Sequence, residues 1–302
     1  MKLRTFIGGA MAVLLPAAMP AYAEDLRFSP AGDEFHFDTG ALRGTLRGGG
    51  KSTGLSAVFD CATGTNLARS MGVFSHYRLL DSETRFGTAA WDWTNTVKLL
   101  PDGAVEALWR ADADHPLDLK AIYRWTASNA LDVTTTVTAR KDLRKFESFL
   151  ASYFNGFSQS RVFAQHNGKS EFIAAEKSSG TWQAFPRDDD AVKIIGDGRW
   201  KRPPHPVEWN IMPQLAAPMG MRHDDATGLT ALIMSRPQDC FGVLTPFGEE
   251  GHRSLYLSLF GRDLKSGESV SAISRLVIGR GISDAQAISM FETFVKEKGG
   301  AD

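Results

Sequence analysis

Short segments in which apolar and polar residues alternate recur along the chain, with turn residues between them. In one of them, Leu131, Val133 and Val137 fall on one face of an extended chain, and Asp132 and Thr134 fall on the other. This alternation predicts a half-buried strand at residues 131–138. Comparable patterns predict strands at residues 34–38, 42–47, 54–60, 97–100, 104–109, 117–125, 229–235, 241–245, 254–260 and 270–279.

Residues 284–298 have helical periodicity instead. Ser283 can cap this helix, and Gln286 completes a capping box. One face carries an apolar stripe that we expect to pack on the core, made of Ala287, Met290, Phe291, Phe294 and Val295. Many short strands and one clear helix predict an all-β fold, a large antiparallel β-sandwich with a C-terminal helix.

A further strand is expected to end in Phe149-Leu150-Ala151-Ser152-Tyr153-Phe154. This hexapeptide resembles the Leu-His-Ser/Thr-Tyr-Phe signature of hexose-6-phosphate epimerases and, more loosely, the His-Pro-Tyr-Phe signature of galactose mutarotases. The turn at residues 265–269, followed by an alternating strand, also resembles the end of galactose mutarotase-like supersandwich domains. The resemblance implies a sugar-handling supersandwich. The family's catalytic histidine aligns with Ala151, and a methyl group cannot protonate a ring oxygen, so we expect little or no mutarotase activity.

Residues 1–23 are typical of a secretory signal peptide. Lys2 and Arg4 precede an apolar run that ends in the small-residue pattern Ala21-Tyr22-Ala23. The run is shorter than the roughly 20 residues of a membrane span, although a lone membrane anchor is the alternative. We therefore expect a periplasmic protein with no membrane span, whose mature chain, residues 24–302, forms a single domain.

The chain has two cysteines, Cys61 and Cys240. In an oxidising compartment an even number of cysteines favours a disulfide. The alternative is a pair of buried thiols that pack like small apolar residues.

The composition restricts the partners. The 302 residues carry a formal net charge of -1, and the sequence pI is about 6.7. Since a nucleic-acid-binding domain is expected to have a pI above about 9, nucleic acid is not an expected partner. No zinc-like histidine spacing occurs, so we expect no cofactor. Calcium at Asp188-Asp189-Asp190 stays open as an alternative to a solvated acidic run.

Two tryptophans flank an aspartate at Trp91, Asp92 and Trp93. On an extended segment the two indoles would point to one side and the carboxylate to the other. Paired indoles offer a flat apolar surface with N–H donors at its edge, which suits a pyranose ring. The alternative is a pair of aromatic core residues.

Prolines between residues 198 and 210 predict a rigid loop. In this loop Trp200 and Trp209 are candidates for sugar contacts, and His205 with Glu208 is either an acid–base pair or a structural hydrogen-bonded pair. Three basic residues either pair with carboxylated or sulfated sugars or are solvated: Arg199, Lys201 and Arg202.

A second candidate loop contains Glu249, Glu250 and His252. Adjacent carboxylates repel, which would raise one pKa if they were partly buried. The resemblance implies a catalytic glutamate late in the chain, and Glu249 or Glu250 matches it by order. His252 is a further acid–base candidate. An exposed charged turn is the alternative.

His76 and Arg78 complete the candidates for substrate binding. A strand-borne arginine can hold hydroxyls or a carboxylate through its planar fork. The alternative for His76 is a hydrogen-bonded core histidine.

Two functions stay open. A carbohydrate-active enzyme, whether epimerase-like, lyase or hydrolase, needs two titratable groups in one cleft. A non-catalytic sugar-binding or envelope protein needs only the aromatic surface and hydrogen-bond donors. A third class, a structural or protein-interaction sandwich, would instead leave Trp91, Trp93 and Trp200 buried or in a flat patch.

Overall fold

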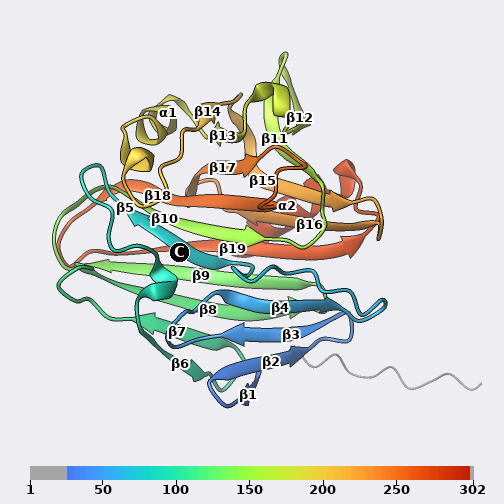
Figure 1. Ribbon diagram of the computed structural model, residues 1–302, viewed down its shortest axis with the longest axis horizontal. Coiled ribbons are helices and arrows are strands. Elements are labelled where there is room, and N and C mark those ends of the chain that lie inside the picture. The colour runs from blue at the N-terminus through green and yellow to red at the C-terminus, as the bar shows by residue number, and fades with distance from the viewer. Residues whose placement is uncertain (1–25, 300–302) are drawn as a thin grey trace, which may run out of the picture.

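The computed structural model describes residues 26–299, and the predicted signal peptide lies outside this range. Its strands form three sheets whose strands run side by side across the molecule (Figure 1). The first sheet has the order β1-β2-β3-β4, with β1 at Ser29–Ala31, β2 at Glu34–Asp38, β3 at Leu42–Arg47 and β4 at Gly54–Asp60.

The second sheet has six strands in the order β14-β13-β17-β18-β10-β5. All its pairs are antiparallel except β13 with β14. Its strands are β5 (Ser75–Leu80), β10 (Leu143–Tyr153), β13 (Trp182–Pro186), β14 (Asn210–Ile211), β17 (Cys240–Pro246) and β18 (Ser254–Leu264).

The third sheet has nine antiparallel strands in the order β12-β11-β15-β16-β19-β9-β8-β7-β6. They are β6 (Asn95–Leu99), β7 (Val105–Trp109), β8 (Leu117–Ala127), β9 (Ala130–Ala139), β11 (Gln159–His166), β12 (Lys169–Ala174), β15 (Leu215–Asp224), β16 (Leu229–Ser235) and β19 (Ser269–Arg280). The α-helices are α1 (Asp189–Ile195) and α2 (Asp284–Lys298), and three short 3-10 helices are η1 (Ala90–Asp92), η2 (Lys177–Ser179) and η3 (Arg199–Lys201).

Every strand that the alternating pattern predicted is present, and the bounds of β2, β3, β4 and β16 are those predicted. The predicted all-β sandwich with a C-terminal helix is confirmed. The prediction missed β1, β5, β11 to β15 and α1. Among these, β5, β13 and α1 contribute to the six-stranded sheet and its outer face, which is where the pocket described below lies.

Helix α2 has its predicted bounds and cap. The Ser283 side chain accepts from the Gln286 backbone N–H, and the Gln286 side chain accepts from the Ser283 backbone N–H, which completes the capping box. Ala287 and Phe294 are buried in a cluster on the nine-stranded sheet. The predicted role of the stripe in packing is therefore confirmed.

The main core draws residues from all three sheets, such as Leu42, Leu150 and Val133. A second cluster lies on the other face of the six-stranded sheet and contains Phe149 and Tyr256. The six-stranded sheet is therefore buried on both faces, and α1 and its connecting loops lie over the outer one (Figure 1). No helix in residues 26–299 is long and apolar enough to span a membrane.

The two cysteines are both free, so the predicted disulfide is not formed. Cys61 directly follows β4 of the four-stranded sheet and is partly exposed, whereas Cys240 is buried in β17 of the six-stranded sheet. The Cys240 thiol lies 3.2 Å from the Gly242 carbonyl oxygen, to which it donates. The alternative of buried thiols therefore holds for Cys240 only, because Cys61 is partly exposed.

Candidate functional site

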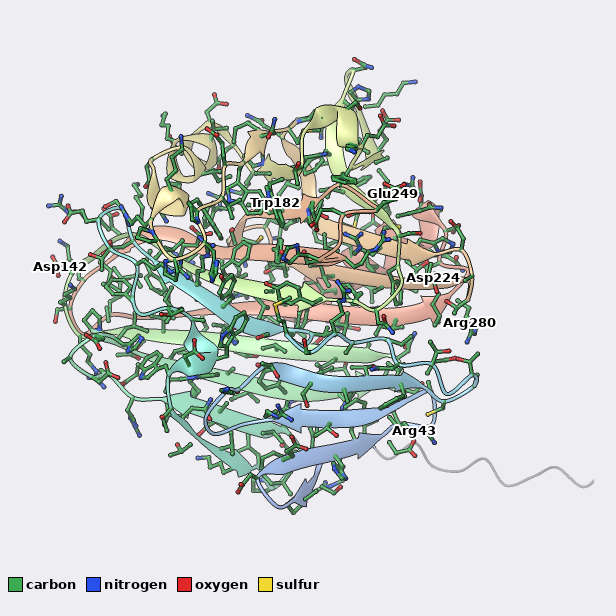
Figure 2. The ribbon with its side chains drawn as sticks, viewed as in Figure 1. Arg43, Asp142, Trp182, Asp224, Glu249 and Arg280 are labelled. Atoms are coloured by element: carbon green, nitrogen blue, oxygen red, sulfur yellow. The ribbon has the colours of Figure 1, made fainter. Side chains whose placement is uncertain are left out.

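A pocket of about 520 Å³ lies on the outer face of the six-stranded sheet. Most of the residues that line it are aromatic: Tyr77, Trp91, Phe149, Tyr153, Trp182, Trp200, Trp209 and Tyr256. The other lining residues are Met71, Arg78, His205, Pro206, Val207 and His252. Trp182 is labelled in Figure 2, above the sheet and close to the centre of the view.

The floor of the pocket is built by the alternation of β10 and β18. Phe149, Ala151 and Tyr153 all belong to the outer cluster, whereas Leu150 between them enters the main core. Ala151 pairs with Tyr256 of β18 and is fully buried. The position that the resemblance assigns to a catalytic histidine therefore lies in the floor of the pocket, and there a methyl group packs beneath the aromatic rings.

The side wall depends on a bulge in the edge strand β5. Ser148 pairs with Leu79 and Leu150 pairs with His76, so two residues of β5, Tyr77 and Arg78, stand opposite one residue of β10. A bulge of this kind redirects side chains. As a result both Tyr77 and Arg78 line the pocket.

The loop over the pocket supplies two further aromatic rings and a histidine. The indoles of Trp200 and Trp209 meet edge to face at 5.3 Å, and Trp200 also contacts Phe149 at 4.6 Å. Both indole Nε1 atoms are buried without a hydrogen-bond partner. His205, at φ 60°, lines the mouth of the pocket and is exposed. The predicted loop thus brings Trp200, His205 and Trp209 to one place.

Two tyrosine hydroxyls and a serine meet at the inner end of the pocket. Ser254 Oγ donates to the Tyr256 hydroxyl, which also interacts with Tyr153. Burial raises the pKa of Tyr256, and burial together with the neighbouring tyrosines raises the pKa of Tyr153. Both phenols are therefore neutral near pH 7 and can donate hydrogen bonds.

At the rim, the Glu250 carboxylate holds His252. Glu250 Oε1 lies 2.9 Å from His252 Nδ1, and Oε2 accepts from the His252 backbone N–H at 2.7 Å. The imidazole packs edge to face on Trp182, with ring centroids 5.3 Å apart. A carboxylate that fixes an imidazole in this way leaves Nε2 for proton transfer or hydrogen bonding.

The pocket unites six of the predicted site residues: Arg78, Trp91, Trp200, His205, Trp209 and His252. Glu250 does not line the pocket, but it contacts His252, which does. Glu249 is exposed in the same loop and is not among the lining residues (Figure 2).

The predicted platform of two parallel indoles at Trp91 and Trp93 is wrong. Residues Ala90–Asp92 form the 3-10 helix η1 and not an extended segment, so the two rings diverge. Trp91 stacks on Tyr77 at 4.4 Å and lines the pocket. Trp93 is 6% exposed, belongs to the main core and stacks on His115 at 4.1 Å. Asp92 is exposed outside the pocket.

His76 is a core histidine and not a pocket residue. Its Nε2 lies 2.9 Å from Thr135 Oγ1 on the facing sheet, and its ring lies 5.6 Å from that of Trp109. Burial lowers the pKa of His76 to about 3. The alternation of β5 places His76 between the sheets, whereas the bulge turns Tyr77 and Arg78 outward.

The predicted pair of His205 and Glu208 is not formed. Glu208 instead makes an ion pair with Lys201 at 3.1 Å and lines an adjoining hollow of about 480 Å³. The other two basic residues of the loop are also occupied, because Arg199 pairs with Asp197 and with the buried Glu147 and Arg202 donates to backbone carbonyls.

The three aspartates proposed as calcium ligands point to separate partners. Asp188 caps α1 by accepting from the Ala191 backbone N–H at 2.8 Å. Asp189 accepts from Gln214, and Asp190 pairs with Lys193. Within residues 26–299 no group of three or more His, Cys, Asp or Glu side chains is placed to hold a metal ion.

Sequence reasoning missed Tyr77, Trp182 and Tyr256. Period-two counting along residues 254–260 would have placed Tyr256 opposite Leu255 and Leu257, on the outer face of the sheet. No local pattern in the sequence marks Tyr77, which a bulge redirects, or Trp182, whose strand pairs with β17 far along the chain.

No family model matches the chain, and no curated protein matches it in sequence. Solved structures do resemble it. Slr1438 from Synechocystis sp. PCC 6803 matches 86% of this chain and 99% of its own at 10% identity, with a TM-score of 0.53. The α-N-acetylgalactosaminidase NagBb from Bifidobacterium bifidum matches 87% of this chain and 39% of its own at 13% identity and 0.51.

A putative aldose 1-epimerase from Escherichia coli K12 also matches 84% of this chain and 98% of its own, at 12% identity and a TM-score of 0.45. Slr1438 and NagBb share the β-sandwich fold of this chain. At these identities the similarity concerns the fold alone.

Proposed function

We propose that the aromatic pocket binds a carbohydrate. The observation that carries this proposal is that aromatic rings cluster in one pocket with the buried, unpartnered N–H donors of Trp200 and Trp209. A pyranose has apolar C–H faces that pack on rings and a rim of hydroxyls that accept from such donors. The name of one structural neighbour, an α-N-acetylgalactosaminidase solved with GalNAc, supports a sugar ligand.

The ligand is proposed to be longer than one sugar residue. The adjoining hollow of about 480 Å³ shares Trp182, Val207 and Trp209 with the pocket. Two hollows that share an aromatic wall suit consecutive residues of an oligosaccharide, with one ring in each.

Binding is tested by calorimetry and by tryptophan fluorescence with glucose, galactose and mannose oligomers and their uronic acid counterparts. Trp209→Ala should weaken the binding of any positive ligand by about tenfold, since loss of an aromatic contact costs about 1.4 kcal/mol. Ile211→Ala is the matched control, because Ile211 is 44% exposed and lines neither hollow. Failure of the unmodified protein to bind any member of the panel would contradict the proposal.

A second candidate function, catalysis on the bound sugar, is favoured by the pairing of Glu250 with His252 at the rim. His252 Nε2 would transfer the proton, and Glu250 would fix the imidazole. If an oligosaccharide is turned over, His252→Ala should lower kcat by about a hundredfold, and Glu250→Gln should change the pH profile of kcat. Aldose mutarotation is not proposed, because Ala151 offers no acid.

We also propose that the protein acts in the periplasm after removal of residues 1–23. The supporting observation is the signal-peptide pattern of the sequence. Cell fractionation with N-terminal sequencing of the mature protein tests this, and a cytoplasmic protein that retains Lys2 would contradict it.

A further inference from the structure

Arg78 is a buried cation in the wall of the pocket. Only 2% of the residue is exposed. The central carbon of its guanidinium lies 4.5 Å from the ring centre of Trp200 and 5.2 Å from that of Tyr77. Its Nη2 donates to the backbone carbonyl of His205 at 2.5 Å. The guanidinium thus lies over two aromatic rings, and its N–H donors are the groups that can bind a ligand.

Two donors on that edge have no partner. Nε and Nη1 of Arg78 are both buried and unpaired. Nη2 carries two hydrogens and gives one to His205. Whichever hydrogen it gives, the other lies beside Nε or beside Nη1, so one two-pronged side of the fork stays open. A carboxylate fits such a fork with two parallel hydrogen bonds.

The charge of Arg78 is also uncompensated. The pocket lining includes no Asp or Glu, and no ion pair is formed by Arg78 among the described residues. Arg85 also lies over the Tyr77 ring, 5.9 Å from its centre, and donates to the carbonyls of Pro204 and Thr88. Burial and the charge of Arg78 lower the pKa of Arg85, which shows that the two cations repel.

Other buried arginines have partners for their donors. Arg222 is fully buried and forms no ion pair in the described part of the chain, but its three nitrogens all donate to oxygens, among them the backbone carbonyls of Phe157, Ser254 and Gly248. Arg199 pairs with Asp197 and Glu147, and Arg275 pairs with Asp132 at 2.6 Å. Burying a charge without a partner costs several kcal/mol, so buried cations are normally paired. Arg78 departs from this pattern at the wall of a pocket, where a ligand can supply the missing anion.

We infer that the carbohydrate bound by this pocket carries a carboxylate, as a uronic acid does, and that Arg78 receives it. The inference rests on the proposed sugar-binding function. A planar carboxylate can lie in the plane of the fork, between the aromatic rings that pack on the guanidinium. The sugar ring then lies over the remaining aromatic residues. This assigns acidic-sugar recognition to Arg78 and not to the basic loop residues that the sequence suggested.

The test compares three matched pairs of oligomers by calorimetry: glucuronate with glucose, galacturonate with galactose, and mannuronate with mannose. At least one acidic member should bind the unmodified protein at least tenfold tighter than its neutral counterpart. A sulfated oligomer of the same backbone forms a further arm, and tighter binding of the sulfated form would overturn the choice of carboxylate.

Variants of Arg78 test whether this residue causes the preference for acidic over neutral oligomers. Arg78→Met keeps most of the apolar stem and should reduce the acidic-to-neutral ratio to about one while neutral binding persists. Arg78→Lys keeps the charge without the fork and should give an intermediate ratio. Arg144→Met is the control, since the Arg144 side chain is 73% exposed and pairs with Glu83. If Arg78→Met does not fold, the acidic-to-neutral binding ratios of the unmodified protein and of Arg78→Lys test the inference instead.

Two failures can be told apart. If neutral members bind as tightly as acidic ones and Trp209→Ala still weakens them, sugar binding stands and the role of Arg78 is refuted. If none of the six oligomers binds, the sugar-binding proposal itself fails, and this inference fails with it.

Discussion

Arg199 is held by two carboxylates, of which Glu147 is fully buried, and its replacement by methionine should destabilise the fold and the pocket together. Its Nη2 lies 2.8 Å from Asp197 Oδ2, and its Nη1 lies 3.3 Å from Glu147 Oε2. Arg199 and Glu147 are fully buried. Glu147 also accepts from Ser258 Oγ at 2.7 Å. These contacts tie η3, which carries Trp200, to the six-stranded sheet.

The two partners are not equally satisfied. Burial raises the pKa of Glu147, even though Arg199 and Ser258 oppose this effect. The pKa of Arg199 is also raised, because its two carboxylates outweigh the cost of its burial. Arg199 therefore gains from both neighbours, whereas Glu147 shares its cation with Asp197. Removal of Arg199 would leave Glu147 as a buried carboxylate without a cation.

Breaking a buried ion pair by removing one partner costs about 3–5 kcal/mol. At about 2–4 °C for each kcal/mol, a 3 kcal/mol loss lowers Tm by about 6–12 °C. The double variant Glu147→Gln/Arg199→Met has no stranded charge and should regain much of this loss. Urea denaturation of the wild type, the two single variants and the double variant measures the coupling.

The pH dependence gives a second check. A carboxyl whose folded pKa lies above its unfolded value adds stability below the unfolded pKa, and this stability is lost as pH rises through the folded pKa. Without Arg199 the pKa of Glu147 should rise further. The deficit of Arg199→Met should therefore be smallest near pH 4 and grow toward pH 8. A deficit that does not change with pH, or a double variant less stable than Arg199→Met, would refute this reasoning.

Two further predictions concern buried titratable groups. Because burial lowers the pKa of His76 to about 3, its contribution to stability should be present above the unfolded pKa of about 6.5 and be lost as pH falls toward 3, by up to about 1.4 kcal/mol per pH unit. Urea titrations of wild type and His76→Gln should show this slope in their difference, and parallel curves would contradict it. Burial raises the pKa of Cys240 to about 12, so iodoacetamide should alkylate only Cys61 in the native protein and both thiols after unfolding without reductant. Intact mass measures this, and a protein that gains a label only after reduction would have a disulfide instead.

The sequence by itself determined many of the strands, the C-terminal helix and the class of fold, although it missed β1, β5 and β11 to β15. Alternation along β2 reports burial of one face, which depends on the chain's own period of two, whereas the apolar run of β16 is buried throughout. The cap of α2 is local as well, since Ser283 and Gln286 are three residues apart. These signals can be read from a single sequence because the residues that carry them lie close together along the chain.

Only the tertiary structure decided the pocket. Its walls come from segments around Tyr77, Tyr153, Trp182, Trp209 and Tyr256, which are brought together by strand pairing across long sequence separations. The sequence did identify the loops of Trp200 and His252, because prolines and glycines mark exposed connections.

The orientation of single side chains was decided in the same way. A 3-10 turn separates Trp91 from Trp93, and a one-residue bulge in β5 turns Arg78 into the pocket while His76 faces the core. A shift of one residue in register exchanges the two faces of a strand. Because pairing with β10 and the bulge decide which residues of β5 face the pocket, the buried guanidinium with two unpaired nitrogens could be recognised only in the folded chain.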